Sequence, residues 1–287
     1  MLNNQVIKKI IEPTKYSHTP IISIIIPTKN SEYHLQNCLT SIINQTYTNI
    51  ETIIIDNYST DTTKTIALQN KTKFYQLKGN AATARNYGIK KTNGKYTLLL
   101  DVDQKILPNM IQKSVETFQK TNIDAIIFPE KSIVKSIWSK TIALEHTLIA
   151  QNSIFAMPRF FKTEVLKKLG EDENIVFGED WDLYLRFKEQ GFKTKIVKEH
   201  ILHTESNLLS KILIKNYFYG FHFRTIAKKH GAKIFRRYTI FPFPIKKILT
   251  HFKKEPKIVS AYIILRILRI TFFLIGVTTR VFRKDIR

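Results

Sequence analysis

Short runs of β-branched residues alternate with helical patterns over the first hundred residues of this 287-residue chain, and this alternation is its strongest constraint on the fold. The run at 21–26 is almost all isoleucine and stops at Pro27, which is typical of a strand buried on both faces of a parallel sheet. Strands separated by helices indicate βαβ units, so we predict an α/β fold with a mostly parallel sheet flanked by helices. The expected strands lie at 21–26, 51–55, 73–77 and 96–100, with a last strand at 193–197, and the expected helices at 31–45, 62–69 and 81–89.

Polar side chains directly follow three of these strands. Pro27 and Lys29 follow the first, Asp56 ends the second, and Asp101 and Asp103 follow the fourth. The carboxyl ends of parallel strands meet at one edge, where such sheets bind ligands, so one shared site is expected there. Carboxylates two residues apart in an extended segment point to the same side and can bind one Mg²⁺ or Mn²⁺. A D-x-D pair alone can also form a turn or cap a helix. The other motifs are therefore needed to decide whether this pair binds a metal.

The composition excludes several classes of protein. With Cys38 as its only cysteine, the chain has no internal disulfide framework. The sequence contains neither the G-x-G-x-x-G dinucleotide fingerprint nor the G-x-x-x-x-G-K-[ST] P-loop.

The net charge of the chain is +23, and residues 206–287 carry 19 basic and two acidic residues, or +17 of that total. This asymmetry indicates an anionic partner, either nucleic acid or a membrane rich in acidic lipid.

Residues 258–282 form the most apolar stretch. Plotted as a helix, they place Arg266, Arg269, Arg280 and the following Arg283 within an arc of about 100°. A helix that is apolar elsewhere and has one basic stripe suits a position in the membrane plane, with the arginines on lipid phosphates. The longest uncharged run, 270–279, is shorter than the roughly 18 residues of a membrane span. We therefore expect peripheral or monotopic association with an anionic membrane surface; a soluble helical appendage is the alternative.

An ordered set of motifs over roughly 20–220 resembles the family 2 glycosyltransferases, inverting enzymes that have the GT-A (Rossmann-like) fold and use nucleotide sugars. Each motif is weak alone, and their common order makes the resemblance specific. The motifs are IIIPTKN at 24–30, LTSIINQTY at 39–47, IDNYSTD at 55–61, ARNYG at 84–88, DVD at 101–103, GEDWDL at 178–183, HTE at 203–205 and KNYFYG at 215–220. Lys29 stands where many relatives carry an aromatic residue, which puts base stacking at that position in doubt.

The resemblance implies a donor site with a divalent cation, Mg²⁺ or Mn²⁺. Pro27 and Lys29 belong to the nucleotide loop, and Asp56 is expected to accept a hydrogen bond from the nucleobase; capping of the following turn is the alternative for Asp56. Arg85 suits the diphosphate or the base, with a surface salt bridge as its alternative. The predicted metal-site residues are Asp103 as a direct ligand, Asp101 near the ribose or a metal-bound water, and His203 as a third metal or diphosphate contact.

The resemblance also implies an acceptor side formed by residues 179–181. Asp180 is the expected general base, which takes the proton of the acceptor hydroxyl during attack on the anomeric carbon. Glu179 is expected to shape the acceptor site. Trp181 is either a platform for the sugar or a core residue. All the acids of this segment also fit the first turn of a helix, where the helix dipole favours negative charge.

These predictions combine into one reading of the chain. It has an N-terminal extension (1–20), a GT-A catalytic domain (21–205) and a basic, helical, membrane-associating C-terminal region (206–287). The expected function is transfer of a sugar from a nucleotide-diphosphate sugar, UDP favoured, to an acceptor hydroxyl or phosphate at the cytoplasmic face of the cell membrane. The expected acceptor is a lipid-linked or glycan intermediate of cell-envelope glycan or glycoprotein assembly, and nucleic acid is not an expected partner. The alternatives are a polyprenyl-phosphate sugar synthase of the same fold, a nucleotidyltransferase, a nucleic-acid-binding protein and a catalytically inactive membrane scaffold.

Overall fold

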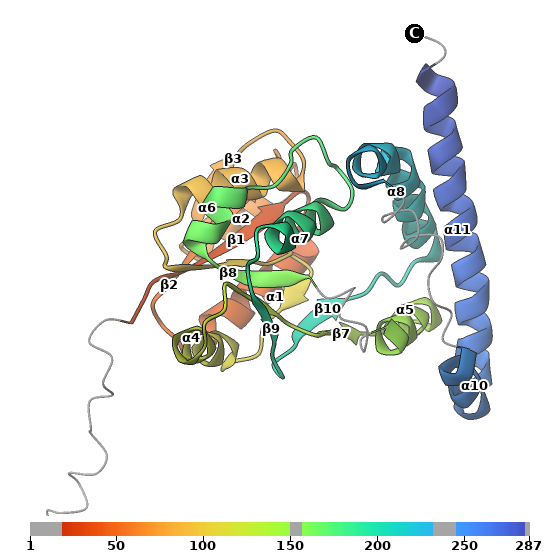
Figure 1. The fold of residues 1–287 in the computed structure, drawn as a ribbon, viewed down its shortest axis with the longest axis horizontal. Helices are drawn as coiled ribbons and strands as arrows, with labels where there is room; N and C mark the ends of the chain where they lie inside the picture. Colours follow the sequence, from red (N-terminus) through yellow and green to blue (C-terminus); the bar gives the residue numbers. More distant parts are fainter. Residues whose placement is uncertain (1–18, 150–156, 232–244, 285–287) are drawn as a thin grey trace, which may run out of the picture.

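The computed structural model describes residues 19–149, 157–231 and 245–284 (Figure 1). Most of the predicted N-terminal extension lies outside the described residues. A seven-stranded sheet forms the centre of the molecule, in the order β3-β2-β1-β4-β8-β6-β9. Its strands are β1 (Ile22–Thr28), β2 (Ile50–Asp56), β3 (Lys73–Gln76), β4 (Tyr96–Leu99), β6 (Ala125–Ile127), β8 (Pro158–Lys162) and β9 (Thr194–Ile196).

Among the described strands of this sheet, only β8 runs against its neighbours β4 and β6; the other pairs in it are parallel. The predicted mostly parallel sheet is therefore confirmed. Successive isoleucines of β1 pack on opposite faces, Ile24 with Leu35 and Met110 on one face and Ile25 with Phe161 on the other. The flanking helices are α1 (Glu32–Ile43), α2 (Thr63–Gln69), α3 (Ala81–Lys91), α4 (Met110–Lys120), α6 (Thr163–Leu169) and α7 (Glu179–Glu189).

A second, three-stranded sheet has the order β5-β10-β7 and lies beside the first. It consists of β5 (Gln104–Lys105), β7 (Glu130–Ile133) and β10 (Ile201–Thr204). The sequence prediction that the strand at 193–197 is the last one is wrong, because β10 follows it. In this sheet His203 pairs with Gln104, and the amide of Thr204 donates to the carbonyl of Asp103 at 3.0 Å. Backbone pairing thus brings two segments together that are a hundred residues apart in sequence.

The C-terminal region is helical where it is described, as predicted. The long helix α11 (Pro256–Lys284) packs along α8 (Leu209–His230) and α5 (Ile137–Ile149), with α10 (Ile245–Lys254) at one end (Figure 1). Helices α8 and α11 cross closely at two glycines. A Cβ atom on Gly220 would lie 1.8 Å from the carbonyl oxygen of Phe273, and one on Gly276 would lie 2.1 Å from that of Tyr217. The boundaries predicted for the three regions stay a prediction.

Two arginines of the basic stripe predicted on α11, Arg269 and Arg280, face the protein. Arg269 pairs with Glu145 and donates to Asn216 at 3.4 Å, and Arg280 donates to the carbonyl of Phe221 at 2.9 Å. The prediction that the arginine stripe pairs with lipid phosphates is therefore wrong for Arg269 and Arg280. Both side chains already have polar partners on the helices that α11 packs against. The side chain of Arg283 lies outside the described part of the structure.

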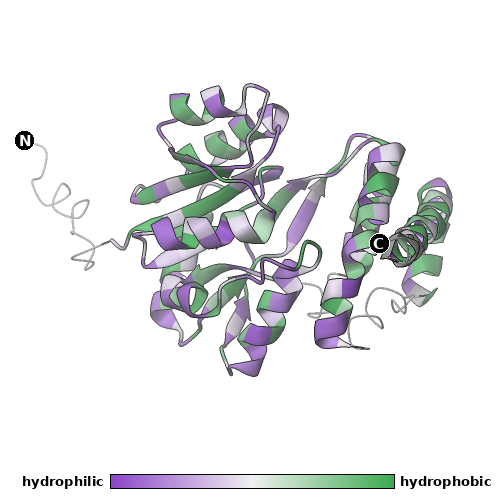
Figure 2. Cartoon of the chain, turned by 90° about the horizontal axis from the view of Figure 1, so that it is seen from above, coloured by the Kyte–Doolittle hydropathy of each residue, from purple (hydrophilic) through white to green (hydrophobic). Residues whose placement is uncertain are grey.

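The opposite side of α11 is apolar and exposed, and Figure 2 shows this helix almost end-on beside α8. Residues Pro256–Arg280 are long and apolar enough to cross a membrane by length and composition alone, and only 22% of the apolar 18-residue stretch within them is buried. This differs from the sequence expectation of a stretch too short for a span, which counts only uncharged residues. A helix can carry two arginines on its packed face and still expose an apolar face. The exposed apolar residues are Ile263, Ile264, Ile267, Ile270, Leu274 and Ile275.

Candidate active site

Asp101 lies just beyond the end of β4 and is held between two arginines. Arg85, from α3, donates to its Oδ1 at 2.7 Å, and Nη1 of Arg159, from β8, lies 3.0 Å from its Oδ2. Burial disfavours the charged form, but Arg159 and Arg85 hold the pKa of Asp101 well below its usual range. The carboxylate is therefore ionised and fixed in orientation. Because both of its oxygens have cationic partners, the part of Asp101 in metal binding stays a prediction.

Sequence reasoning missed Arg159. The strand β8 runs antiparallel to β4, with Leu98 opposite Phe160, and this pairing brings Arg159 to the strand end where Asp101 lies. Arg159 also lies 3.7 Å from Glu130, so it links the two sheets. No motif includes Arg159, and only the unpredicted antiparallel insertion of β8 places it at the rim.

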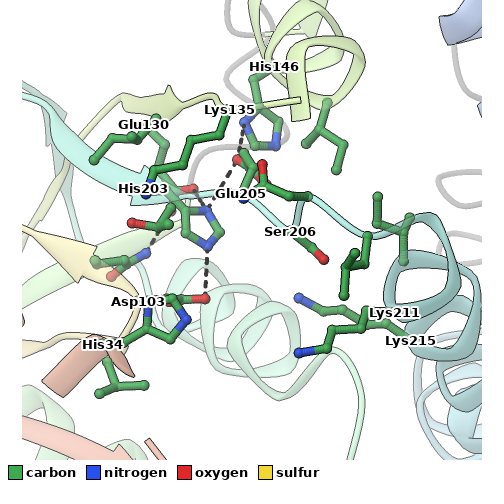
Figure 3. Close-up of a pocket in the computed structure, with 18 of the residues that line it drawn as sticks. His34, Asp103, Glu130, Lys135, His146, His203, Glu205, Ser206, Lys211 and Lys215 are labelled. Carbon is green, nitrogen blue, oxygen red and sulfur yellow. Dashed lines mark hydrogen bonds and ion pairs between the residues drawn. The ribbon is translucent and has the colours of Figure 1, made fainter. Parts of the chain in front are cut away.

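Asp103 and His203 lie together, as the predicted metal site requires. Nε2 of His203 is 3.2 Å from Oδ2 of Asp103, and its Nδ1 is 3.3 Å from Oε2 of Glu130 (Figure 3). Burial alone would lower the pKa of His203, but the carboxylates of Asp103 and Glu130 raise it to about 10. An imidazole held from behind by a carboxylate is the usual arrangement of a metal-binding histidine.

These groups would fit a divalent cation only if further ligands came from outside the protein. Among the described residues, no group of three or more histidine, cysteine or acidic side chains is arranged to hold a metal ion by itself. Mg²⁺ and Mn²⁺ take few protein ligands when diphosphate oxygens and water supply the rest. Asp103 would supply one oxygen ligand. His203 would supply one nitrogen ligand once the cation displaces the proton from its Nε2, with Glu130 behind the imidazole.

Asp56 ends β2 and is completely buried. Its carboxylate accepts hydrogen bonds from the hydroxyl of Thr28 at 2.9 Å and from the amide of Ser59 at 2.8 Å. The three β-strand ends therefore share one edge, as predicted, with Pro27 half-buried and Lys29 exposed after β1. The role of Asp56 toward a nucleobase stays a prediction.

Arg85 connects this edge to the predicted acceptor side. Its Nη1 lies 3.2 Å from Glu179, in the first turn of α7, and 3.4 Å from Glu171. Burial raises the pKa of Glu171 to about 7, and burial also raises the pKa of Glu179. Asp180 follows Glu179 at the start of α7, where its Oδ1 accepts a hydrogen bond from the amide of Trp181 at 2.8 Å. Sequence reasoning missed Glu171, which no motif includes.

Trp181 is only 8% exposed. Its indole packs with Phe177, Phe223 and Phe273 in a hydrophobic cluster that joins α7 to α8 and α11. The structure thus places Trp181 in the core and leaves a contact with the acceptor as a prediction. The neighbouring Asp182 is fully buried and forms ion pairs with Arg186, Lys229 and His230, so it acts structurally.

A cavity of about 800 Å³ begins at Asp103 and His203 and extends toward α8 and α11 (Figure 3). Lys211 and Lys215 line it from α8, and Arg269 lines it from α11. Its volume is that of a site for a small-molecule substrate. Basic residues of α8 and α11 therefore line the same cavity as Asp103, Glu130 and His203.

The family model described as "Glycosyl transferase family 2" matches residues 23–178. A glycosyltransferase of Rickettsia typhi is 30% identical over 194 residues, which cover 60% of this chain and 59% of that protein. The chain therefore spans about 59% of the length of that relative. The chondroitin synthase of Escherichia coli is 25% identical over 256 residues, or 82% of this chain and 36% of the synthase. The minor teichoic acid biosynthesis protein GgaB of Bacillus subtilis is 29% identical over 210 residues, or 63% of this chain and 22% of GgaB.

Solved structures show the same fold. The mannosyltransferase PcManGT of Pyrobaculum calidifontis, in complex with GDP-Man and Mn²⁺, aligns with a TM-score of 0.63 at 12% identity, over 93% of this chain and 89% of PcManGT. Residues 1–349 of S. aureus TarS, in complex with UDP, align with a TM-score of 0.53 at 18% identity, over 93% of this chain and 92% of that 1–349 chain. The GT-A fold predicted from the motifs is therefore confirmed. With more than half of its residues matched by the family model and its strand-end acids gathered at one edge, the chain belongs to glycosyl transferase family 2.

Proposed function

We propose that this protein transfers a sugar, with inversion, from a nucleotide-diphosphate sugar to an acceptor hydroxyl with the help of a divalent cation. The observation that carries the proposal is the 3.2 Å approach of His203 to Asp103, beside an edge that also holds Asp56 and Asp101. An isolated strand-end aspartate is an ordinary turn residue. Here the aspartate lies against a histidine from a second sheet and beside a large cavity. The two side chains could bind a metal ion, and the cavity has room for the diphosphate that this ion would hold.

The residues of the chain divide the chemistry between them. When bound, the metal would neutralise the diphosphate as the glycosidic bond breaks. Arg85 and Arg159 hold Asp101 ionised and oriented at the edge of the sheet. Asp180 takes the proton of the acceptor hydroxyl, and Glu179 beside it is held by Arg85. UDP is the favoured donor nucleotide, which is also the nucleotide in the TarS complex.

The apolar face of α11 supports a site of action at a membrane. Its exposed isoleucines and leucine would lie in the bilayer or at its surface, while Arg269 on the other face reaches the cavity. We propose a lipid-linked or glycan acceptor of cell-envelope assembly, at the cytoplasmic face, where anionic lipid attracts the basic C-terminal region. The similarity to the teichoic acid protein GgaB is compatible with such an acceptor.

The function is tested on the full chain in detergent with a panel of UDP- and GDP-sugars, with Mn²⁺, Mg²⁺ or a chelator. We expect donor-dependent thermal stabilisation and slow sugar-nucleotide hydrolysis, both lost on chelation. Asp103→Asn should lose the metal-dependent stabilisation. Glu189→Gln, an exposed change at the far end of α7, serves as the control. A wild-type protein that responds to no nucleotide sugar would refute the proposal.

A further inference from the structure

The cavity next to Asp103 carries more positive charge than its own acids can neutralise. Lys211 and Lys215 lie one turn apart on α8, and their amines point toward Asp103 across the cavity (Figure 3). Neither amine forms an ion pair with a carboxylate in the part of the chain that the structure describes. The amine of Lys215 lies over the ring of Tyr219, 5.7 Å from its centre, which fixes its direction without cancelling its charge.

The acids that line the cavity already have other partners. Glu145 pairs with Arg269, and Glu205 lies 3.4 Å from His146. Glu130 lies between His203 and Arg159. These pairings leave the two lysines of α8 available for an anion that enters from solvent.

The residues that line the cavity indicate which part of a bound nucleotide sugar would lie in it. The predicted nucleotide contacts Asp56, Arg85 and Asp101 do not line it, and neither does Asp180, the predicted base. Asp103 lines the cavity and also lies at the edge of the sheet where the predicted nucleotide contacts are found. A donor bound through a metal on Asp103 therefore turns its diphosphate, rather than its base or its acceptor-facing carbon, toward Lys215.

We propose that Lys215, assisted by Lys211, binds the donor's diphosphate directly and stabilises it as the leaving group. This inference rests on the proposed function. In the transfer, the acceptor oxygen forms a bond to the anomeric carbon while its proton passes to Asp180. The bond from that carbon to the diphosphate oxygen breaks, and its electron pair stays on the diphosphate. The leaving group gains one negative charge in this step, and a cation placed beside it lowers the barrier.

The test compares the dissociation constants of UDP and UMP, or of GDP and GMP if guanine is preferred, with Mn²⁺ by titration calorimetry. Lys215→Gln should weaken diphosphate binding about tenfold or more, since one charged hydrogen bond is lost. It should change monophosphate binding much less, so the preference for the diphosphate falls. Lys215→Arg should restore most of that preference because it keeps the charge. Lys211→Gln should show a smaller loss in the same direction.

Lys228→Gln is the matched control, because Lys228 is an exposed lysine of the same helix outside this cavity. An unchanged ratio of UDP to UMP affinity in both Lys215→Gln and Lys211→Gln would overturn the inference while leaving the proposed function intact. A wild-type protein that binds neither UDP nor GDP would overturn both. Equal weakening of UDP and UMP would show that Lys215 supports only the fold, which also contradicts the inference.

Discussion

Replacing Gly220 by alanine tests the crossing of α8 and α11, which carries Arg269 to the cavity. The new methyl carbon would lie 1.8 Å from the carbonyl oxygen of Phe273, whereas ordinary contact begins at 3.4 Å, so the two backbones must move apart by about 1.6 Å. Because the contacted atom belongs to the backbone, no side-chain rotation relieves the clash. Separation also loosens the edge-to-face contact of Phe223 and Phe273, whose centres are 5.2 Å apart.

Overpacking costs about 1–3 kcal/mol, and a clash with backbone atoms lies in the upper part of that range, at about 2–3 kcal/mol. Alanine recovers about 1 kcal/mol of helix propensity, so we expect a net loss of about 1–2 kcal/mol. That corresponds to a fall in Tm of about 2–8 °C, measured by circular dichroism of the full chain in detergent. Thr271→Ala, on the exposed face of α11, should leave the Tm within about 1 °C, as is usual for surface changes. A Gly220→Ala protein as stable as this control would refute the close crossing.

Three further predictions concern the site and the exposed apolar face of α11. Asp180→Asn should leave donor binding intact and lower transfer by about 10²–10⁴-fold, since general base catalysis is lost; weaker donor binding with unchanged turnover would contradict this role. Glu171 has a folded-state pKa raised to about 7, so it takes up a proton on folding, and this contribution to stability is lost as the pH rises through 7. Urea denaturation should accordingly show that the wild type loses more stability between pH 5 and pH 8 than Glu171→Gln does, and equal losses would argue against a proton on Glu171. Replacing both Ile267 and Leu274 with glutamate should move the protein from the membrane fraction to the supernatant, whereas Lys228→Gln should not; an unchanged distribution would exclude this face from membrane binding.

Predictions from sequence succeeded where the signal is local. Asp56 and Asp101 each follow an apolar strand, and the parallel topology alone brings strand ends to one edge. The meeting of Asp103 with His203 has a different origin, because it depends on a sheet of two- to four-residue strands too short to show a periodic pattern. For those strands only the family motifs indicated the site.

The remaining differences come from tertiary contacts. Arg159 reaches Asp101 because β8 inserts antiparallel into the sheet, and strand order is not encoded in the local pattern around residue 159. The helical plot of 258–282 correctly grouped Arg269 with Arg280 on one face. The plot could not show whether that face points to the protein or to its surroundings. The contacts with Glu145 on α5 and with the backbone of α8 turn it toward the protein.

The central claim is that Asp103 and Asp180 serve a metal-dependent transfer with inversion at the anomeric carbon. The most direct measurement follows donor turnover by proton NMR in the presence of Mn²⁺, fast enough to record the configuration of the released or transferred sugar before it equilibrates. The account predicts that an α-linked donor first gives the β product, and that Asp103→Asn and Asp180→Asn each abolish this signal. A first product that retains the α configuration, or turnover that persists in both variants, would contradict it.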